Sequence, residues 1–112
     1  TDSTKSTDYP IYGFKLGEAI KNGTITRGVV ICGSGIGISI ACNKVKGVRC
    51  AKVSNVKEVK WARHDNDANV IAFSSKTPFF RVKDMVDVFL KKEFSNVKRH
   101  KERVEMLNGY EG

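Results

Sequence analysis

Three short apolar runs constrain what this chain can fold into more than any other feature of the sequence. The clearest is Gly28–Cys32, a continuous stretch of valine, isoleucine and cysteine that ends at Gly33. A short apolar run without polar alternation is typical of a strand that is covered on both faces, as in a parallel sheet. The runs Val48–Val53 and Val70–Phe73 are the second and third candidate strands.

Segments with a helical spacing of apolar residues separate these strands. The spacing predicts a long amphipathic helix that begins at Pro78, and further helices over Tyr9–Asn22, Gly35–Asn43, Val56–His64 and Val97–Leu107. In the helix after Pro78, we expect one apolar face formed by Val82, Met85, Val86, Phe89 and Leu90. Alternating strands and helices indicate a parallel sheet with helices on both faces. The 112 residues are therefore predicted to form a single α/β domain.

Charge and cysteine content narrow the classes of function. Lys and Arg number 20 against 12 Asp and Glu, and a net charge of +8 suits an anionic partner such as a phosphate, a nucleic acid or an acidic lipid. The basic segment Lys91–Arg103 has no nucleic-acid-binding motif, and no apolar run approaches the ~20 residues of a membrane span. The odd cysteine count, without a Cys-x-x-Cys pair, argues against a disulfide framework and a zinc site and fits the reducing cytoplasm; the cysteines are Cys32, Cys42 and Cys50.

The turn after the first predicted strand is the first candidate site. The segment Cys32–Gly37 leads from a strand into a helix, where backbone N–H groups can bind an anion. A cysteine at this position should have a lowered pKa. The dinucleotide fingerprint Gly-x-Gly-x-x-Gly and the P-loop Gly-Lys-Ser/Thr are both absent. A glycine-rich turn that serves packing alone is the alternative.

Two further polar segments are candidates. The segment Arg63–Asn69 precedes the third strand and is unusually polar, although an ordinary hydrogen-bonded turn would also explain it. Arg99 and Arg103 share one helix face, and paired guanidinium groups suit a phosphate, although a solvated basic face is the simpler explanation. Because ligands bind at the carboxyl ends of parallel strands, we expect all three segments at that edge of the sheet.

Taken together, these motifs resemble the type B ribose-5-phosphate isomerase family, which includes the galactose-6-phosphate isomerase subunits. The similar segments, in order, are Asp8-Tyr9-Pro10, Ile31–Ala41, Asn43-Lys44, Gly47-Val48-Arg49, Asn66–Val70, Arg99-His100 and Arg103-Val104. The resemblance implies a Rossmann-like αβα sandwich and a homodimer or homotetramer with active sites shared between subunits. It implies no cofactor, metal, nucleic acid or membrane partner.

The resemblance also implies the interconversion of ribose 5-phosphate and ribulose 5-phosphate through an enediolate. Cys32 would be the base that moves the proton between C1 and C2, while the loop N–H groups and the Ser34 hydroxyl would stabilise the enediolate oxygen. The other implied substrate- and phosphate-binding residues are Tyr9, Gly33, Gly35, Ile36, Gly37, Asn66, Lys76, Arg99 and Arg103.

The sequence departs from the family pattern at the residue that opens the sugar ring. The family has a His directly before the Asn-Asp-Ala-Asn run, where this chain has Asp65, and His64 stands one residue earlier. Either His64 reaches the substrate, or Asp65 serves with a raised pKa, or ring opening is weak; our hypothesis is that His64 substitutes in part. Milder departures are Ser34, Ser74 and Lys76, where the family usually has Thr, Gly and Arg.

The start of the chain also departs from the family pattern. The first residue is Thr1 rather than Met, and the residues up to Asp8 lack the pattern of a signal peptide. The resemblance implies a strand, a helix and a second strand before the Asp-Tyr-Pro turn, with an Asp-His pair in the substrate pocket, and we expect this domain to lack that unit. The rival functions are a galactose-6-phosphate isomerase subunit and a non-catalytic sugar-phosphate-binding or interaction protein.

Overall fold

Helices and strands alternate along most of the chain. The computed structural model describes residues 8–111; residues 1–7, most of the stretch compared above with a signal peptide, lie outside the described part. The elements are α1 (Tyr9–Lys21), β1 (Gly28–Cys32), α2 (Ile36–Asn43), β2 (Cys50–Lys52), α3 (Val56–Asn66), β3 (Val70–Ser74), α4 (Phe79–Lys91) and α5 (Lys98–Gly109). Every helix and strand expected from the sequence is present.

The strand β3 lies at the centre of a parallel three-stranded sheet, which has the order β1-β3-β2. Val70, the first residue of β3, is the register partner of both Gly28 and Cys50, and Ser74 at its other end is the partner of Cys32. The carboxyl ends of β1 and β3 therefore lie side by side.

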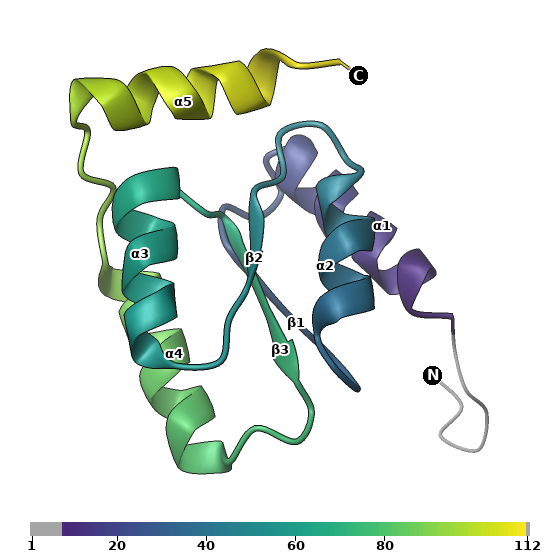
Figure 1. Cartoon of the computed structure of the whole chain (residues 1–112). Helices are drawn as coiled ribbons and strands as arrows, with labels where there is room; N and C mark the ends of the chain where they lie inside the picture. The colour runs from purple at the N-terminus through teal and green to yellow at the C-terminus, as the bar shows by residue number, and fades with distance from the viewer. Residues whose placement is uncertain (1–7, 112) are drawn as a thin grey trace.

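An apolar core covers each face of the sheet, as Figure 1 shows by the pairs α1/α2 and α3/α4 on its two sides. Val70 and Ala72 of β3 pack on the α2 side, against Val30, Ile38, Cys42, Val45 and Val48. Ile71 and Phe73 pack on the other side, against Val53, Val59, Met85 and Phe89. This alternation buries both faces of β3, which explains its continuous apolar sequence and confirms the predicted sandwich.

Two elements differ from the expectation in ways that matter for the site. The helix α3 was expected to end at His64 but continues to Asn66, because Asp67 adopts the left-handed conformation (φ 48°) and its N–H caps the carbonyl of Arg63 at 3.3 Å. The strand β2 is shorter than expected, because the backbone N–H of Arg49 donates to the side-chain oxygen of Asn69 at 2.7 Å rather than to a neighbouring strand.

The apolar face of α4 is also narrower than expected. Met85 and Phe89 are fully buried, but Leu90 is 57% exposed. Leu90 follows Phe89 directly, so the helical period turns it about 100° away from the buried side. Among the described residues, none of the helices has the length and apolar character needed to cross a lipid bilayer.

Candidate active site

The turn between β1 and α2 presents Cys32 at the carboxyl end of the sheet. Cys32 ends β1 and is half-buried, and the backbone N–H of Gly35 donates to its Sγ at 3.2 Å. Gly35 has a φ of +82°, and a Cβ there would stand 2.8 Å from the carbonyl carbon of Phe73. Glycine is therefore required at this position, both for the left-handed backbone and for the close approach of the turn to β3.

The surroundings of Cys32 favour its thiolate. Burial raises the pKa of the thiol, but several hydrogen bonds together outweigh burial and lower the pKa below its ordinary value; they come from the backbone N–H groups of Ile38, Gly35 and Ser34 and from the Ser34 hydroxyl. The direction agrees with the expectation for a cysteine before a helix N-terminus. A lowered pKa raises the fraction of thiolate near neutral pH, and the thiolate is the form that can accept a proton.

Other predicted residues surround this turn. A Cβ on Gly37 would lie 2.7 Å from the ring of Tyr9, so the first residue of α1 rests against the start of α2. The hydroxyl of Ser74 donates to the carbonyl of Gly33 at 2.7 Å and accepts the N–H of Lys76 at 3.1 Å, which fixes the Lys76 loop beside the turn. We call Tyr9, Cys32, Gly33, Ser34, Gly35, Ile36, Gly37 and Lys76 the thiol half-site.

The last turn of α3 carries a second group of predicted residues. His64 Nδ1 and Asp65 Oδ1 are 2.6 Å apart, and Asn66 follows as the last helical residue. The hydrogen bond from His64, with smaller contributions from the charges of His100, His64 and Arg99, lowers the pKa of Asp65 although burial opposes it. The alternative in which Asp65 serves with a raised pKa is therefore wrong, and Asp65 cannot readily donate a proton.

Arg99 and Arg103 lie one turn apart on α5, and both are exposed. The charge of Arg99 acts on the carboxylate of Asp65, which places this end of α5 beside the last turn of α3. We call His64, Asp65, Asn66, Arg99 and Arg103 the imidazole half-site.

The two half-sites lie at opposite ends of the sheet (Figure 1). Cys32 pairs with the last residue of β3, whereas the N–H of Gly28 donates to the carbonyl of Asn69, just before the first residue of β3. The five residues of β3 span about 16 Å. The expectation that all three segments meet at the carboxyl edge is therefore wrong for Arg63–Asn69 and for the two arginines of α5. A helix that leads into a parallel strand ends at that strand's amino end, so its last turn cannot reach the opposite edge.

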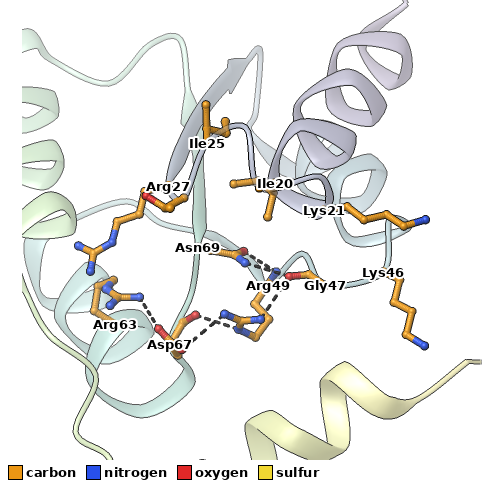
Figure 2. A pocket seen from close by; sticks show the side chains of 12 residues that line it. Ile20, Lys21, Ile25, Arg27, Lys46, Gly47, Arg49, Arg63, Asp67 and Asn69 are labelled. Atoms are coloured by element: carbon orange, nitrogen blue, oxygen red, sulfur yellow. Dashed lines mark hydrogen bonds and ion pairs between the residues drawn. The ribbon is translucent and has the colours of Figure 1, made fainter.

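A basic pocket at the amino end of the sheet contains residues to which the sequence pattern assigned no individual role (Figure 2). Its volume is about 520 Å³, and its charged lining consists of Lys21, Arg27, Lys46, Arg49, Arg63 and Asp67. Asp67 accepts hydrogen bonds from Arg63 Nη1 at 2.8 Å and from Arg49 Nη2 at 3.5 Å.

Two arginines of this pocket donate hydrogen bonds to main-chain carbonyls near the C-terminal end of α4. Arg63 donates to the carbonyl of Lys92 at 2.9 Å, and Arg27 donates to that of Phe89 at 2.6 Å. Carbonyls at helix C-termini lack partners within the helix and carry partial negative charge. The cations therefore support the scaffold that holds the last turn of α3. A buried guanidinium cannot be recognised from sequence alone. Charged residues directly before a buried strand are nevertheless a usable sign of such an ion pair.

Comparison with known proteins shows what the whole chain is similar to. A family profile described as Ribose/Galactose Isomerase matches residues 1–107. Ribose-5-phosphate isomerase B of Escherichia coli K12 is 38% identical over 112 residues, which cover 99% of this chain and 74% of that protein.

Two solved structures extend the comparison. The type B enzyme of Clostridium thermocellum has a TM-score of 0.90 at 43% identity, with 96% of this chain and 73% of that chain covered. Ribose-5-phosphate isomerase B of Mycoplasma genitalium, solved with bound ribulose 5-phosphate, has a TM-score of 0.87 at 37% identity, with 95% and 70% covered. The chain thus spans about seven-tenths of the length of these relatives.

Proposed function

Because the chain belongs to the ribose/galactose isomerase family, we propose that it is an aldose–ketose isomerase that interconverts ribose 5-phosphate and ribulose 5-phosphate. The observation that carries the proposal is the half-buried Cys32, whose pKa is lowered at the start of α2. The ribulose 5-phosphate bound to the relative from Mycoplasma genitalium supports the choice of a pentose phosphate. In this proposal residues 1–112 act as one domain.

The thiol half-site supplies the proton transfer. The Cys32 thiolate removes the C2 proton of the open-chain aldose, and the electron pair of that C–H bond forms the C1–C2 double bond of an enediolate. Return of the proton to C1, with a proton moving between the two oxygens, gives the ketose. The N–H of Ile36 donates to the Ser34 hydroxyl at 3.1 Å, and that of Ile38 serves the Cys32 thiolate. The N–H of Gly37 between them has no carbonyl partner within the helix, so it can stabilise the enediolate oxygen. Ser34 and Tyr9 contact the substrate beside Cys32 in this proposal.

The imidazole half-site supplies binding and ring opening. Arg99 and Arg103 present two guanidinium groups from one face of α5, which suits a phosphate dianion. Asn66 binds the sugar hydroxyls, and Lys76 adds a positive charge from the opposite half-site. His64 substitutes in part for the family histidine, since the lowered pKa of Asp65 leaves the imidazole as the better proton donor.

The working site combines the thiol half-site of one copy with the imidazole half-site of a second copy. Acid–base groups act only within hydrogen-bond reach of the same substrate, and within one chain the two half-sites stand apart by the length of β3. A homodimer with two-fold symmetry, or a homotetramer built from such dimers, would create two identical sites. The cysteines are free thiols, which suits a reducing compartment, and we assign the protein to the cytoplasm.

A complementation experiment tests this proposal. Two inactive proteins are made, one with Cys32→Ala and one with both Arg99→Ala and Arg103→Ala, and they are unfolded and refolded together. In a random mixture half of the dimers are mixed, and each mixed dimer has one intact site, so about a quarter of the parent sites should return. The control mixes the double arginine variant with Asn66→Ala; both defects lie in the same half-site, so no activity should return.

Each outcome bears on a separate part of the proposal. Full ribose 5-phosphate turnover by Cys32→Ala would reject the thiol as the base. An inactive mixture, beside an active parent, would reject the composite site. Phosphate-dependent binding without any turnover by the parent would favour a non-catalytic sugar-phosphate-binding protein.

A further inference from the structure

Both histidines of the chain converge on one carboxylate. The sequence contains only His64 and His100, which lie on α3 and α5. Their rings meet edge to face with centroids 5.7 Å apart. The Oδ1 atom of Asp65 stands 2.6 Å from Nδ1 of His64 and 3.8 Å from Nε2 of His100. Two imidazoles and a carboxylate are a common ligand set for a transition-metal ion.

The spacing of these three groups is close to that of a tetrahedral metal site. One ring nitrogen of each histidine and a carboxylate oxygen of Asp65 all lie within 4.8 Å of one another. Zinc–ligand bonds of about 2.0–2.2 Å place tetrahedral ligands about 3.4 Å apart. The widest separation must therefore contract by about 1.4 Å, and the 2.6 Å between His64 Nδ1 and Asp65 Oδ1 must widen by about 0.8 Å. His64, with 47% of its side chain exposed, can turn to do so.

His100 is held in the orientation that a metal ligand needs. Its side chain is only 8% exposed, and its Nδ1 lies 2.7 Å from the hydroxyl of Ser95. When Nδ1 donates to that hydroxyl, the lone pair of Nε2 is directed toward Asp65. Metal-binding histidines usually have such a second hydrogen bond, which fixes the tautomer and the ring.

We propose that His64, Asp65 and His100 form a binding site for a divalent transition-metal ion of the Zn²⁺ class, with water in the remaining position. The site uses no cysteine, so the cysteine spacing gave no indication of it. The isomerisation proposed above needs no metal. An ion here and proton transfer by His64 exclude each other, because both use the same imidazole.

One neighbouring charge opposes the ion. Arg99 acts on the carboxylate of Asp65, and a second cation nearby lowers the affinity for a metal. Replacing Arg99 with Gln should therefore tighten Zn²⁺ binding, whereas a loosely attracted surface ion would respond to any of the exposed lysines of α5.

Titration of the whole chain with Zn²⁺, followed by calorimetry and by NMR of the imidazole side chains, tests the site. We expect one ion per chain and shifts of both imidazole signals. His64→Ala, at an exposed position, should weaken binding at least tenfold, and His100→Gln should do the same. Cys50→Ser is the matched control, since thiols also bind zinc, and it should leave the affinity unchanged.

Two results would overturn the site. The first is unshifted imidazole signals in the presence of excess Zn²⁺. The second is an affinity that survives His64→Ala or falls in Cys50→Ser, which would assign the ion to a thiol. Because binding is measured without substrate, these results are independent of whether the chain isomerises ribose 5-phosphate.

Discussion

Arg63 and Asp67, one turn apart at the end of α3, form an ion pair of 2.8 Å between Nη1 and Oδ1, and only 4% of the Arg63 side chain is exposed. A buried guanidinium is stable only while a carboxylate and carbonyl oxygens satisfy its donors. Asp67 supplies that carboxylate and also caps α3. The last turn of α3, which carries His64 and Asn66, therefore depends on this pair for its position.

Replacing Asp67 with Asn should destabilise the protein. Asn tolerates the left-handed backbone that Asp67 adopts, so the substitution removes the charge and little else. We expect a loss of about 1–3 kcal/mol in the free energy of unfolding, below the usual cost for a fully buried pair because Asp67 is partly exposed. Urea denaturation measures it.

Glu102→Gln is the control for this prediction. Glu102 pairs with Lys98 at 3.7 Å on the exposed face of α5, with the same spacing along a helix. An exposed pair of this kind contributes about 0.5 kcal/mol or less. Equal losses in the two variants would contradict the structural role of Arg63 and Asp67.

Replacing Gly35 with Ala should destabilise the thiol half-site. The left-handed backbone alone costs an alanine about 1–2 kcal/mol, and the new Cβ would press on the backbone of Phe73. Thermal or urea unfolding should show at least that loss. Gly33→Ala is the comparison, because a Cβ at Gly33 meets nothing within 4 Å. A Gly33 variant as unstable as the Gly35 variant would show that crowding at Phe73 is not the cause.

The pKa of Cys32 should be visible in its alkylation by iodoacetamide. Only the thiolate reacts, so the rate rises with pH through the pKa, and the lowered pKa places the midpoint below that of the same cysteine in the urea-unfolded chain. Ser34→Ala removes one of the hydrogen bonds that stabilise the thiolate, so its midpoint should move to higher pH. Mass spectrometry of the Cys32 peptide separates this thiol from Cys50. Equal midpoints in the folded and the unfolded chain would show that the surroundings of Cys32 do not favour its thiolate.

The role of His64 should appear in the direction of the reaction. Ribose 5-phosphate is mostly a closed ring in solution. Ribulose 5-phosphate cannot form the corresponding ring, because the oxygen that would close it, O5, carries the phosphate. If His64 helps to open the ring, His64→Ala should slow turnover of ribose 5-phosphate by about 10²-fold and turnover of ribulose 5-phosphate much less.

The comparison variant for His64 is Asp65→Ala. It removes the carboxylate that bonds the imidazole at 2.6 Å but leaves the proton donor in place. A smaller defect is expected, again confined to the aldose direction. Unchanged turnover by His64→Ala would refute the hypothesis of partial substitution.

Most of the fold could be predicted because local sequence and buried environment agree. The run Gly28–Cys32 is apolar at every position after the glycine, and the strand has the predicted bounds. The end of α3 was missed because it depends on the left-handed conformation of Asp67, and no glycine stands there to signal such a helix end. Leu90 was misplaced because an apolar residue on a helix can lie beside the core without entering it.

The sequence predicted the lowered pKa of Cys32 but not the separation of the candidate segments between the two ends of the sheet. The glycine pattern around Cys32 indicated a thiol with a lowered pKa, since the cause lies within a few residues of it. The large separation between Cys32 and Asn66 does not follow from the residues around either of them, because it depends on which end of β3 each segment adjoins. A segment that precedes a parallel strand lies at the amino end of that strand, and a segment that follows it lies at the carboxyl end. This rule distinguishes the two half-sites.

The central position of β3 determines which amide hydrogens of this protein should exchange last. Its amides have strand neighbours on both sides, and Val70, Ile71, Ala72 and Phe73 are fully buried. Amides of this kind exchange with solvent deuterium only in global unfolding, whereas amides at exposed helix ends exchange through local fluctuations. Because Asn69 leads into β3 and Ser74 ends it, the slowest-exchanging strand of the molecule should be the one that links its two half-sites.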